Sequence, residues 1–325
     1  MRMIALLGLA AALLALVTTP AAAQTYPARP VTIVVPYAAG GNTDAIARTL
    51  AHRLEQRLGQ PFVIEQRLGA ASVIGATYVA RATPDGHTIM IGTSTTMAVN
   101  VGVYKKLPYD PTRDLVPIAL VAGVPFVLVI NPALPVKSLA DLARYAKTLP
   151  DGLTYASNGP GGAAHLFAEL LGGELGIKLV HVPYKGLSPA LNDIVAGHVQ
   201  MMFGDFATAL PLIKAGKLNP LGVSTLQRVA AAPEIPALVE VGLKDFDASS
   251  WQMMVAPAKI PADILGKLNS EFRAIVKEPA VEAEFSRRGL ISLDGGTPEQ
   301  LQAYVRSEIV RWGEVSKRAG VFASQ

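Results

Sequence analysis

Apolar runs of strand length alternate with helical patterns along the N-terminal third of the chain. Residues 31–35 form a β-branched run that is typical of a buried parallel strand. Apolar side chains then recur at helical spacing from Ile46 to Leu58, and Gly59 ends that pattern. The next segments predict a strand at 62–65, a helix at 71–82 and a strand at 88–92. This βαβαβ order predicts a parallel sheet covered by helices.

The same order of elements recurs in the middle of the chain. Strand-like runs lie at 153–157, 178–182 and 199–204, and helical patterns lie at 163–175 and 189–196. In both parts, each of the three strands is followed by a turn rich in glycine or polar residues. We therefore expect an α/β protein of two equivalent lobes, each a mostly parallel sheet with flanking helices.

Two lobes of this kind can enclose a cleft. In open parallel sheets, ligands bind beyond the carboxyl ends of the strands, so loops of both lobes can converge on one gap. We expect crossovers near 122–125 and near 249–251, with a strand at 253–257 returning to the first sheet. Residues 24–122 and 252–325 then form lobe one, and residues 123–251 form lobe two. Two crossovers make a hinge that can close around a ligand.

The first 23 residues have the three regions of a cleaved signal peptide. Arg2 precedes an apolar run from Ile4 to Val17, and residues 21–23 are an alanine triplet that provides an A-x-A-like cleavage site. The run is too short for a transmembrane anchor, and no later stretch approaches the roughly 18 consecutive apolar residues of a membrane span. We expect the mature protein to be free in the periplasm.

Composition narrows the chemistry that is possible. The 325 residues are 50% hydrophobic and 17% charged, which suits large buried cores. The absence of cysteine excludes disulfides, thiolate metal sites and cysteine nucleophiles. A formal net charge of +4 is spread without basic runs, so we do not expect nucleic acid as a partner. The five histidines are scattered, and we predict neither a metal nor a cofactor.

The turn after the first strand carries Gly40 and Gly41 directly before a helix. Without β-carbons the backbone can approach a ligand closely, and the free N–H groups and dipole of the helix start favour an anion. Asn42, Thr43 or Asp44 can also cap the helix. The charge of Asp44 does not suit direct contact with an anion, so this residue is expected to cap the helix or to hold a water or neighbouring amides.

The corresponding turn of lobe two, from Gly159 to Ala164, matches the loose G-x-G-x-x-[GA] dinucleotide pattern. The acidic residue that should end the next strand is absent, because residues 180–183 read VHVP, so a nicotinamide cofactor is not expected. The turn can still offer amides to a small anion. His165, in the first turn of the following helix, either contacts the ligand or serves as a capping and packing residue.

Hydroxyl and polar residues follow the remaining strands. Residues 93–96 read TSTT and share with a nucleophile elbow only its first Gly and its Ser. No base accompanies Ser94, so hydrogen bonding to a ligand suits this segment better than nucleophilic attack. In lobe two, Tyr184 can supply a ring face and a phenol donor, and Asp205 an acceptor. Their alternative roles are a core tyrosine and a helix N-cap.

Six segments, taken in their order and spacing, resemble the periplasmic receptors of tripartite tricarboxylate transporters, the Bug receptors. They are YPARPVTIVVPYAAGGNTDAIAR, ATPDGHTIMIG, LPYDPTRDL, YASNGPGGAAHL, HVPYKGLSPALNDIVAGHVQMMFGD and WQMMVAPAKIP, which together extend over essentially all of the mature chain. The resemblance implies a two-lobed fold of the type II periplasmic-binding, or Venus flytrap, class. It also implies capture of small carboxylates, largely through main-chain amides and waters at the first Gly-Gly turn.

The candidate ligand-binding residues follow from this resemblance together with the third-strand turn. They are Tyr37, Ala39, Gly40, Gly41, Asn42, Asp44, Ser94, Thr95, Ser157, Gly159, Gly162, His165, Tyr184 and Asp205. The chain departs from the family's usual Glu-Asn-Arg-Pro-Gly-Ala-Gly-Gly stretch, because residues 65–72 read EQRLGAAS. The lost glycines add β-carbons near the rim of the expected pocket.

We predict a binding receptor and not an enzyme. It captures a small mono- or dicarboxylate in the cleft as a monomer, closes around it, and delivers it to the membrane subunits of a tripartite tricarboxylate-type transporter. One alternative keeps the receptor but has it present the bound carboxylate to a membrane signalling partner. The other is a secreted α/β hydrolase, which would depend on Ser94.

Overall fold

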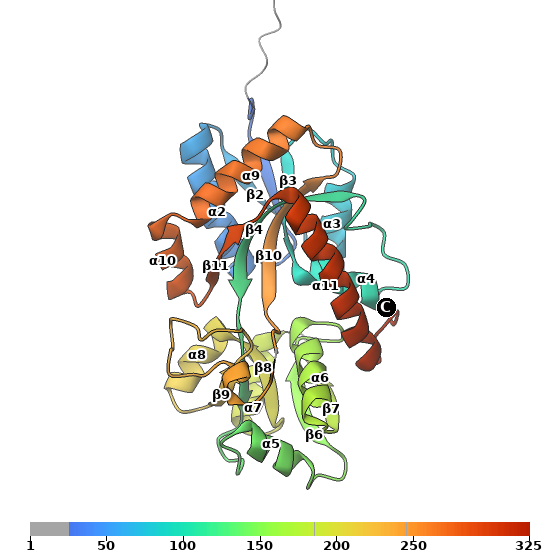
Figure 1. Cartoon of the computed structure of the whole chain (residues 1–325), viewed down its shortest axis with the longest axis vertical. Coiled ribbons are helices and arrows are strands. Elements are labelled where there is room, and N and C mark those ends of the chain that lie inside the picture. Colours follow the sequence, from blue (N-terminus) through green and yellow to red (C-terminus); the bar gives the residue numbers. More distant parts are fainter. Residues whose placement is uncertain (1–25, 185, 245) are drawn as a thin grey trace, which may run out of the picture.

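The computed structural model describes residues 26–184, 186–244 and 246–325, so the predicted signal peptide lies outside it. The side chain of Ser188 is also not described. Two lobes, each built around one β-sheet, lie one above the other along the long axis of the molecule (Figure 1). The predicted two-lobed α/β fold is confirmed.

Lobe one has a six-stranded sheet of order β11-β4-β10-β3-β1-β2. Its strands are β1 (Val31–Val35), β2 (Phe62–Gln66), β3 (Thr88–Thr93), β4 (Leu115–Val124), β10 (Ser250–Pro257) and β11 (Ile291–Gly295). Its helices and helical turns are α2 (Asn42–Leu58), η1 (Ala70–Ser72), α3 (Val73–Ala80), η2 (Thr95–Val99), α4 (Asn100–Val103), α9 (Ala262–Val276), α10 (Pro279–Arg287) and α11 (Pro298–Arg318).

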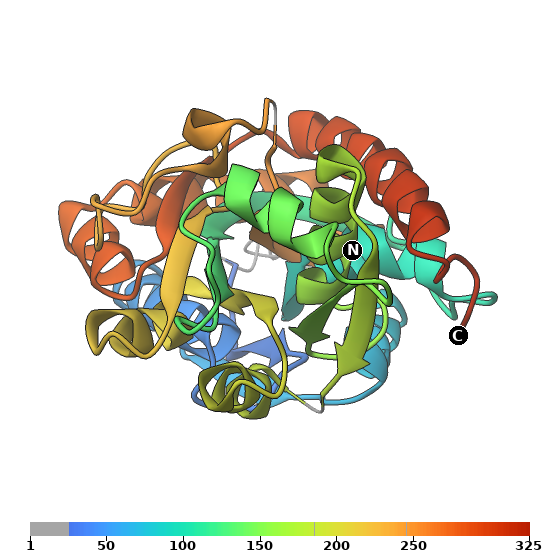
Figure 2. The same ribbon diagram turned by 90° about the horizontal axis from the view of Figure 1, so that it is seen from below.

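Lobe two has a five-stranded sheet of order β7-β6-β8-β5-β9. Its strands are β5 (Phe126–Ile130), β6 (Leu153–Ser157), β7 (Leu179–Pro183), β8 (Met201–Asp205) and β9 (Asn219–Val223). Its helices are α5 (Leu139–Ala146), α6 (Ala163–Leu175), α7 (Leu187–Ala196), α8 (Phe206–Lys214) and the short η3 (Leu238–Val241). Seen along the long axis, these helices surround the strands, and α11 runs along the outside (Figure 2).

Both sheets are mixed, but most strands of each run in the same direction, as predicted. The predicted βαβαβ units are parallel, since β1 pairs with β2 and β3, and β6 pairs with β7 and β8, in parallel register. The additional strands β10 and β5 each run antiparallel to both of their neighbours. Each of these two strands enters its sheet from the other lobe, on the side where the parallel strands end, and must therefore run in the opposite direction.

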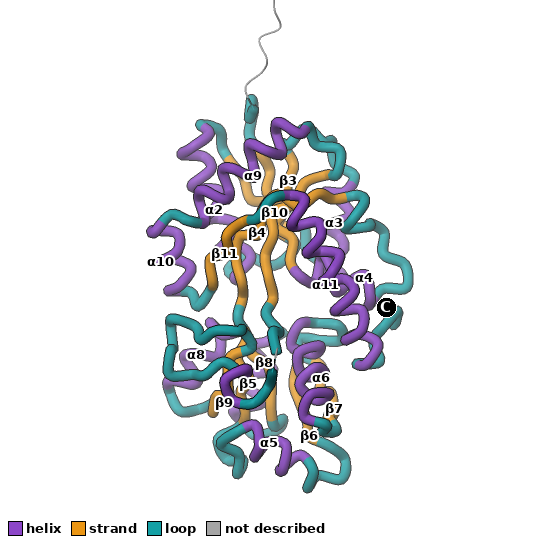
Figure 3. The backbone as a smooth tube through the Cα atoms, viewed as in Figure 1, coloured by secondary structure: helices purple, strands orange, loops and turns teal. Residues whose placement is uncertain are grey.

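Strands β4 and β10 connect the lobes. Leu115 of β4 pairs with Pro257 of β10 at one end of this ribbon, and Val124 pairs with Ser250 at the other end, where both strands reach the hinge (Figure 3). Pro125 then separates β4 from β5. The chain thus leaves lobe one just after Val124 and returns just before Ser250. The domain boundaries expected at 122/123 and 251/252 remain predictions.

The prediction of a helix at 71–82 is wrong at its start. Ala70, Ala71 and Ser72 have φ angles of 46°, 48° and 77°, in the left-handed region that an α-helix cannot contain. These residues form the tight turn η1, and α3 begins only at Val73.

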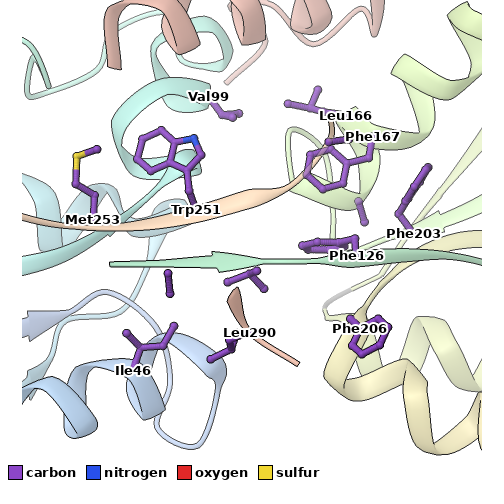
Figure 4. Packing of buried hydrophobic residues seen from close by; sticks show 14 of the residues in the cluster. Ile46, Val99, Phe126, Leu166, Phe167, Phe203, Phe206, Trp251, Met253 and Leu290 are labelled. Atoms are coloured by element: carbon purple, nitrogen blue, oxygen red, sulfur yellow. The ribbon is translucent and has the colours of Figure 1, made fainter. Parts of the chain in front are cut away.

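The apolar cores of the two lobes are continuous through the hinge. Phe167 of α6 lies 5.5 Å from Trp312 of α11, measured between ring centroids, and Phe126 packs edge-on against Phe167 at 5.0 Å. In Figure 4, Trp251 and Phe167 lie on the same side of the ribbons that cross between the lobes. The C-terminal helix of lobe one is therefore packed against lobe two as well.

Candidate functional site

A cavity of about 480 Å³ lies between the lobes. Lobe one contributes Tyr37, Gly40, Gly41, Asn42, Thr43, Thr93, Thr95, Val124, Ser250 and Gln252, and lobe two contributes Phe126, Asn158, Ala163, Leu187, Asp205, Ala207 and Thr208. Three larger hollows, of about 740, 720 and 670 Å³, are formed by residues of lobe one alone. The cavity between the lobes is the one reached by the carboxyl ends of β1, β3 and β8, where an open α/β sheet binds its ligand.

Helix α2 begins at this cavity. Its N-cap residue is Gly41, and no side chain caps the helix there. Gly40 has a φ of 85°, which favours glycine, and turns the chain into the helix. The N–H groups of the first helical turn are therefore available to an anion in the cavity, with the helix dipole behind them.

Asp44 stabilises the turn that precedes α2. Its carboxylate is 4% exposed and accepts hydrogen bonds from the Gly40 N–H (3.0 Å), from Arg48 Nε (2.9 Å) and from Gln66 Nε2 (3.0 Å). The bond from Arg48, with those from Gly40 and Gln66, holds the pKa of this carboxyl below its usual value. Asp44 thus holds a neighbouring amide, and the Gly40 N–H points to Asp44 instead of to a ligand.

Asp205 belongs to the wall of the cavity on the side of lobe two. It is 8% exposed, and its Oδ2 accepts a hydrogen bond of 2.8 Å from Asn42 Nδ2 of lobe one. Its Oδ1 accepts from the Thr208 N–H at 3.3 Å and so caps α8. Burial raises the pKa of this carboxyl above its usual value. The residue therefore combines the N-cap role with a place in the cavity wall.

Of the hydroxyl residues at the end of β3 and just after it, Thr93 and Thr95 line the cavity, whereas Ser94 does not. Tyr37 Oη lies 3.1 Å from Thr93 Oγ1, and both residues line the cavity together with Thr95. The Ser94 side chain is buried, and its Oγ lies 2.9 Å from Ser250 Oγ at the start of β10. Ser94 is therefore held by another serine, with no histidine among its recorded hydrogen-bond partners.

The lobe-two turn expected to bind the ligand is organised mostly around two histidines. Ser157 Oγ lies 2.6 Å from His181 Nε2, and the Gly161 N–H donates to His165 Nδ1 at 3.0 Å. The imidazole rings of His165 and His181 stack with centroids 4.0 Å apart. Burial, with a smaller effect of His181, lowers the pKa of His165 to about 4, so the ring is neutral at neutral pH.

Several candidate residues do not line the cavity. Ala39 and Gly159 are exposed or half-buried residues of the two turns, Gly162 is the N-cap of α6, and Tyr184 Oη donates to Asp193 Oδ2 at 2.6 Å. Asp44, Ser94, Ser157 and His165 likewise do not line it. For all of these, a role in ligand binding remains a prediction.

The cavity also contains residues that the sequence analysis did not select. Lobe two adds Asn158, Ala163 and Leu187, and the hinge strand β10 adds Ser250 and Gln252. Thr93 and Thr208 could have been found, because each follows a strand that the sequence predicts. Ser250 and Gln252 could not, because their place depends on the antiparallel pairing of β10 with β3 and β4.

Within residues 26–184, 186–244 and 246–325, no group of three or more His, Asp or Glu side chains is placed to hold a metal ion. In the same part of the chain, none of the helices combines the length and the apolar character needed to cross a membrane.

Comparison with known proteins places the chain in a family. Residues 46–321 match the tripartite tricarboxylate transporter family receptor. The solved structure of R. palustris Rpa4515 with adipate has 37% sequence identity and a TM-score of 0.80, over 91% of this chain and 98% of that one.

Two other solved structures are similar over comparable lengths. The periplasmic binding protein BugD has 36% identity and a TM-score of 0.77, over 91% of this chain and 99% of BugD. MatC from Rhodopseudomonas palustris with bound malate has 34% identity and a TM-score of 0.75, over 89% and 99%.

The matching family is one of transporter receptors and not of enzymes, in agreement with the prediction, and the hydrolase alternative is not supported. The resemblance seen in the sequence is confirmed. The chain belongs to the tripartite tricarboxylate transporter receptor family, the Bug-type periplasmic solute-binding receptors.

Proposed function

We propose that this protein binds a small mono- or dicarboxylate in the cavity between its lobes and delivers it to the membrane subunits of a tripartite tricarboxylate-type transporter. The observation that carries the proposal is the N-terminus of α2, which opens on the cavity without a capping side chain. None of the described lining residues is Lys, Arg or His. Main-chain N–H groups, amides and hydroxyls are therefore the donors that these residues offer to a carboxylate.

Such donors are sufficient for an uptake receptor. A micromolar dissociation constant corresponds to about −8 kcal/mol. Several charge-assisted hydrogen bonds, each contributing roughly 1.5–3 kcal/mol, reach that value after the costs of association and lobe closure are subtracted. Amides at a helix start also bind an anion without the burial of a full countercharge. The adipate and malate in the two solved relatives support the choice of carboxylates as ligands.

The ligand class is tested by thermal shift and calorimetry on the purified protein without residues 1–23. We expect adipate, malate or another small acid to raise the melting temperature in a concentration-dependent way. The diamide of the same acid is the matched control, because it has a similar shape and no charge, and we expect it to bind much more weakly. A shift with a neutral sugar or a divalent cation, and with none of the acids, would contradict the proposal.

Delivery to a transporter is tested in cells. We expect deletion of the gene to abolish uptake of the radiolabelled acid that binds best, and re-expression with the signal peptide to restore it. Retained uptake, together with capture of a membrane kinase and not of transporter subunits in a crosslinking experiment, would favour the signalling role instead.

A further inference from the structure

A buried chain of hydroxyl groups leads from the cavity into lobe one. Tyr37 Oη lies 3.1 Å from Thr93 Oγ1, which lies 3.2 Å from Thr96 Oγ1, which in turn lies 2.8 Å from Ser72 Oγ. Tyr37 is half-buried and lines the cavity, whereas Thr96 and Ser72 are at most 1% exposed and do not line it. The chain thus joins the cavity wall to the tight turn η1.

The two central hydroxyls have no free hydrogen-bonding capacity. Thr93 Oγ1 accepts from the Thr96 N–H at 3.3 Å, and Thr96 Oγ1 accepts from the Thr93 N–H at 3.2 Å. Each threonine oxygen therefore has three partners, which equals its one proton and two lone pairs. As a result, all protons along the chain must point in one direction, either toward the cavity or toward Ser72.

The buried end decides between these two directions. Apart from Thr96, Ser72 Oγ has no hydrogen-bond partner among the described residues. If the protons pointed inward, the Ser72 proton would be a buried donor without an acceptor, which is unfavourable. If they point outward, Ser72 donates to Thr96, Thr96 to Thr93 and Thr93 to Tyr37, and only lone pairs of Ser72 are left unpaired. The outward direction is therefore favoured.

The position of Ser72 is fixed by the backbone around it. Three successive residues, Ala70 to Ser72, have positive φ angles, and neighbouring side chains hold this turn in place. Asn100 Nδ2 donates to the Ala71 carbonyl at 2.9 Å, and Tyr104 Oη donates to the Ala70 carbonyl at 3.0 Å. Ser72 therefore carries a hydroxyl at a backbone position where a side chain is disfavoured.

We propose that this hydroxyl chain fixes the Tyr37 phenol as a hydrogen-bond donor toward the cavity, so that the ligand atom beside Tyr37 must be an acceptor, such as a carboxylate oxygen. The inference rests on the proposed function and specifies one of its contacts. Thr96 and Ser72 are then positioning residues, which touch no ligand and polarise the donor through Thr93. An ammonium or another donor-only group at this place would leave the Tyr37 proton without an acceptor and is therefore disfavoured.

The direction of the chain is tested by neutron diffraction from crystals of the perdeuterated protein without added ligand. We expect the Ser72 deuteron on the line to Thr96 Oγ1, the Thr93 deuteron on the line to Tyr37 Oη, and the Tyr37 deuteron directed into the cavity. A Tyr37 deuteron on the line to Thr93 Oγ1 overturns the inference. Because no ligand is needed, this result is independent of whether any carboxylate binds.

The effect on binding is tested by calorimetry with adipate and malate. We expect Thr96→Val to weaken binding of the acid that binds wild type by about two- to five-fold, and Tyr37→Phe by about ten-fold. In the Tyr37→Phe background, Thr96→Val should have no further effect. Thr77→Val is the matched control, because among the described residues Thr77 Oγ1 bonds only to the Val73 carbonyl in α3, outside the hydroxyl chain.

The outcomes separate the two proposals. An undiminished loss from Thr96→Val in the Tyr37→Phe background overturns the hydroxyl chain, while carboxylate binding itself stands. Absence of any acid binding to wild type overturns the proposed function, and the deuteron positions alone then decide the direction of the chain.

Discussion

Asn42 of lobe one donates a hydrogen bond of 2.8 Å to the buried carboxylate of Asp205 of lobe two. Both residues line the cavity, and both stand at helix starts, Asn42 at that of α2 and Asp205 as the N-cap of α8. The same contact therefore joins the two lobes and forms part of the wall around the ligand. Any opening of the hinge must break it and expose Asp205 to water.

We expect Asn42→Ala to weaken carboxylate binding by roughly ten-fold or more, because the closed form loses a hydrogen bond to a charged group that contributes about 1.5–3 kcal/mol. Calorimetry with the acid that binds wild type measures the effect. Asn42→Asp should weaken binding further, since two carboxylates would then face each other across the lobes. Unchanged affinity in both variants would show that this contact does not contribute to closure.

The second prediction concerns pH and His165. Its folded pKa of about 4 lies below the usual value near 6.5, so the unfolded chain takes up the proton first as the pH falls. The contribution of the neutral His165 ring to the free energy of unfolding is therefore complete above pH 6.5 and is lost progressively as the pH falls to about 4. We expect a loss of roughly 2–3 kcal/mol in the free energy of unfolding across that window, because each pKa unit corresponds to about 1.4 kcal/mol.

Urea unfolding at several pH values measures this loss. His165→Asn is the matched variant, because the asparagine Oδ1 can accept the Gly161 N–H in place of Nδ1 but does not titrate. The difference in stability between wild type and this variant should shrink as the pH falls from 7 to 4. Parallel pH profiles for the two proteins would contradict the assignment.

The third prediction concerns the anchor of α11 at the hinge. Glu308 is 5% exposed, and its Oε2 accepts the indole N–H of Trp251 and that of Trp312, each at 2.9 Å. Glu308→Ala leaves two buried donors without an acceptor, for which we expect a loss of about 2–4 kcal/mol in stability. Glu308→Gln keeps an acceptor oxygen and should lose less. Equal stability of the two variants in chemical unfolding, followed by tryptophan fluorescence, would argue against this role.

The parts of the site that could be predicted from sequence are those set by local rules. Residues 31–35 form β1 as expected, and the glycine pair after it lies at the cavity because parallel strands present their carboxyl ends together. Gln252 and Ser250 belong to the site only through the long-range pairing of β10, which no local pattern reveals. The contacts of Asp44 with Gln66, and of His165 with His181, also form only when distant parts of the chain become neighbours in the folded protein.

The last prediction concerns the strained turn η1, where Ala71 has a φ of 48°. An alanine in the left-handed region is disfavoured by roughly 1–2 kcal/mol, whereas glycine adopts it readily. Glycine also gains entropy in the unfolded chain, which offsets part of this relief. We therefore expect Ala71→Gly to raise the free energy of unfolding by about 0.5–1 kcal/mol, measured by urea unfolding.

Ala303→Gly serves as the control for that measurement. Ala303 is an exposed residue inside the long helix α11, where the backbone is right-handed and glycine is disfavoured. There the same substitution should lower stability by about 1 kcal/mol. Opposite signs for the two variants would show that the backbone angle at residue 71, and not the loss of a methyl group, governs the change. A decrease at both positions would contradict the prediction. It would mean that loss of the Ala71 methyl group weakens the contacts around the turn, such as the bond from Asn100 to the Ala71 carbonyl, by more than the relief of backbone strain stabilises the protein.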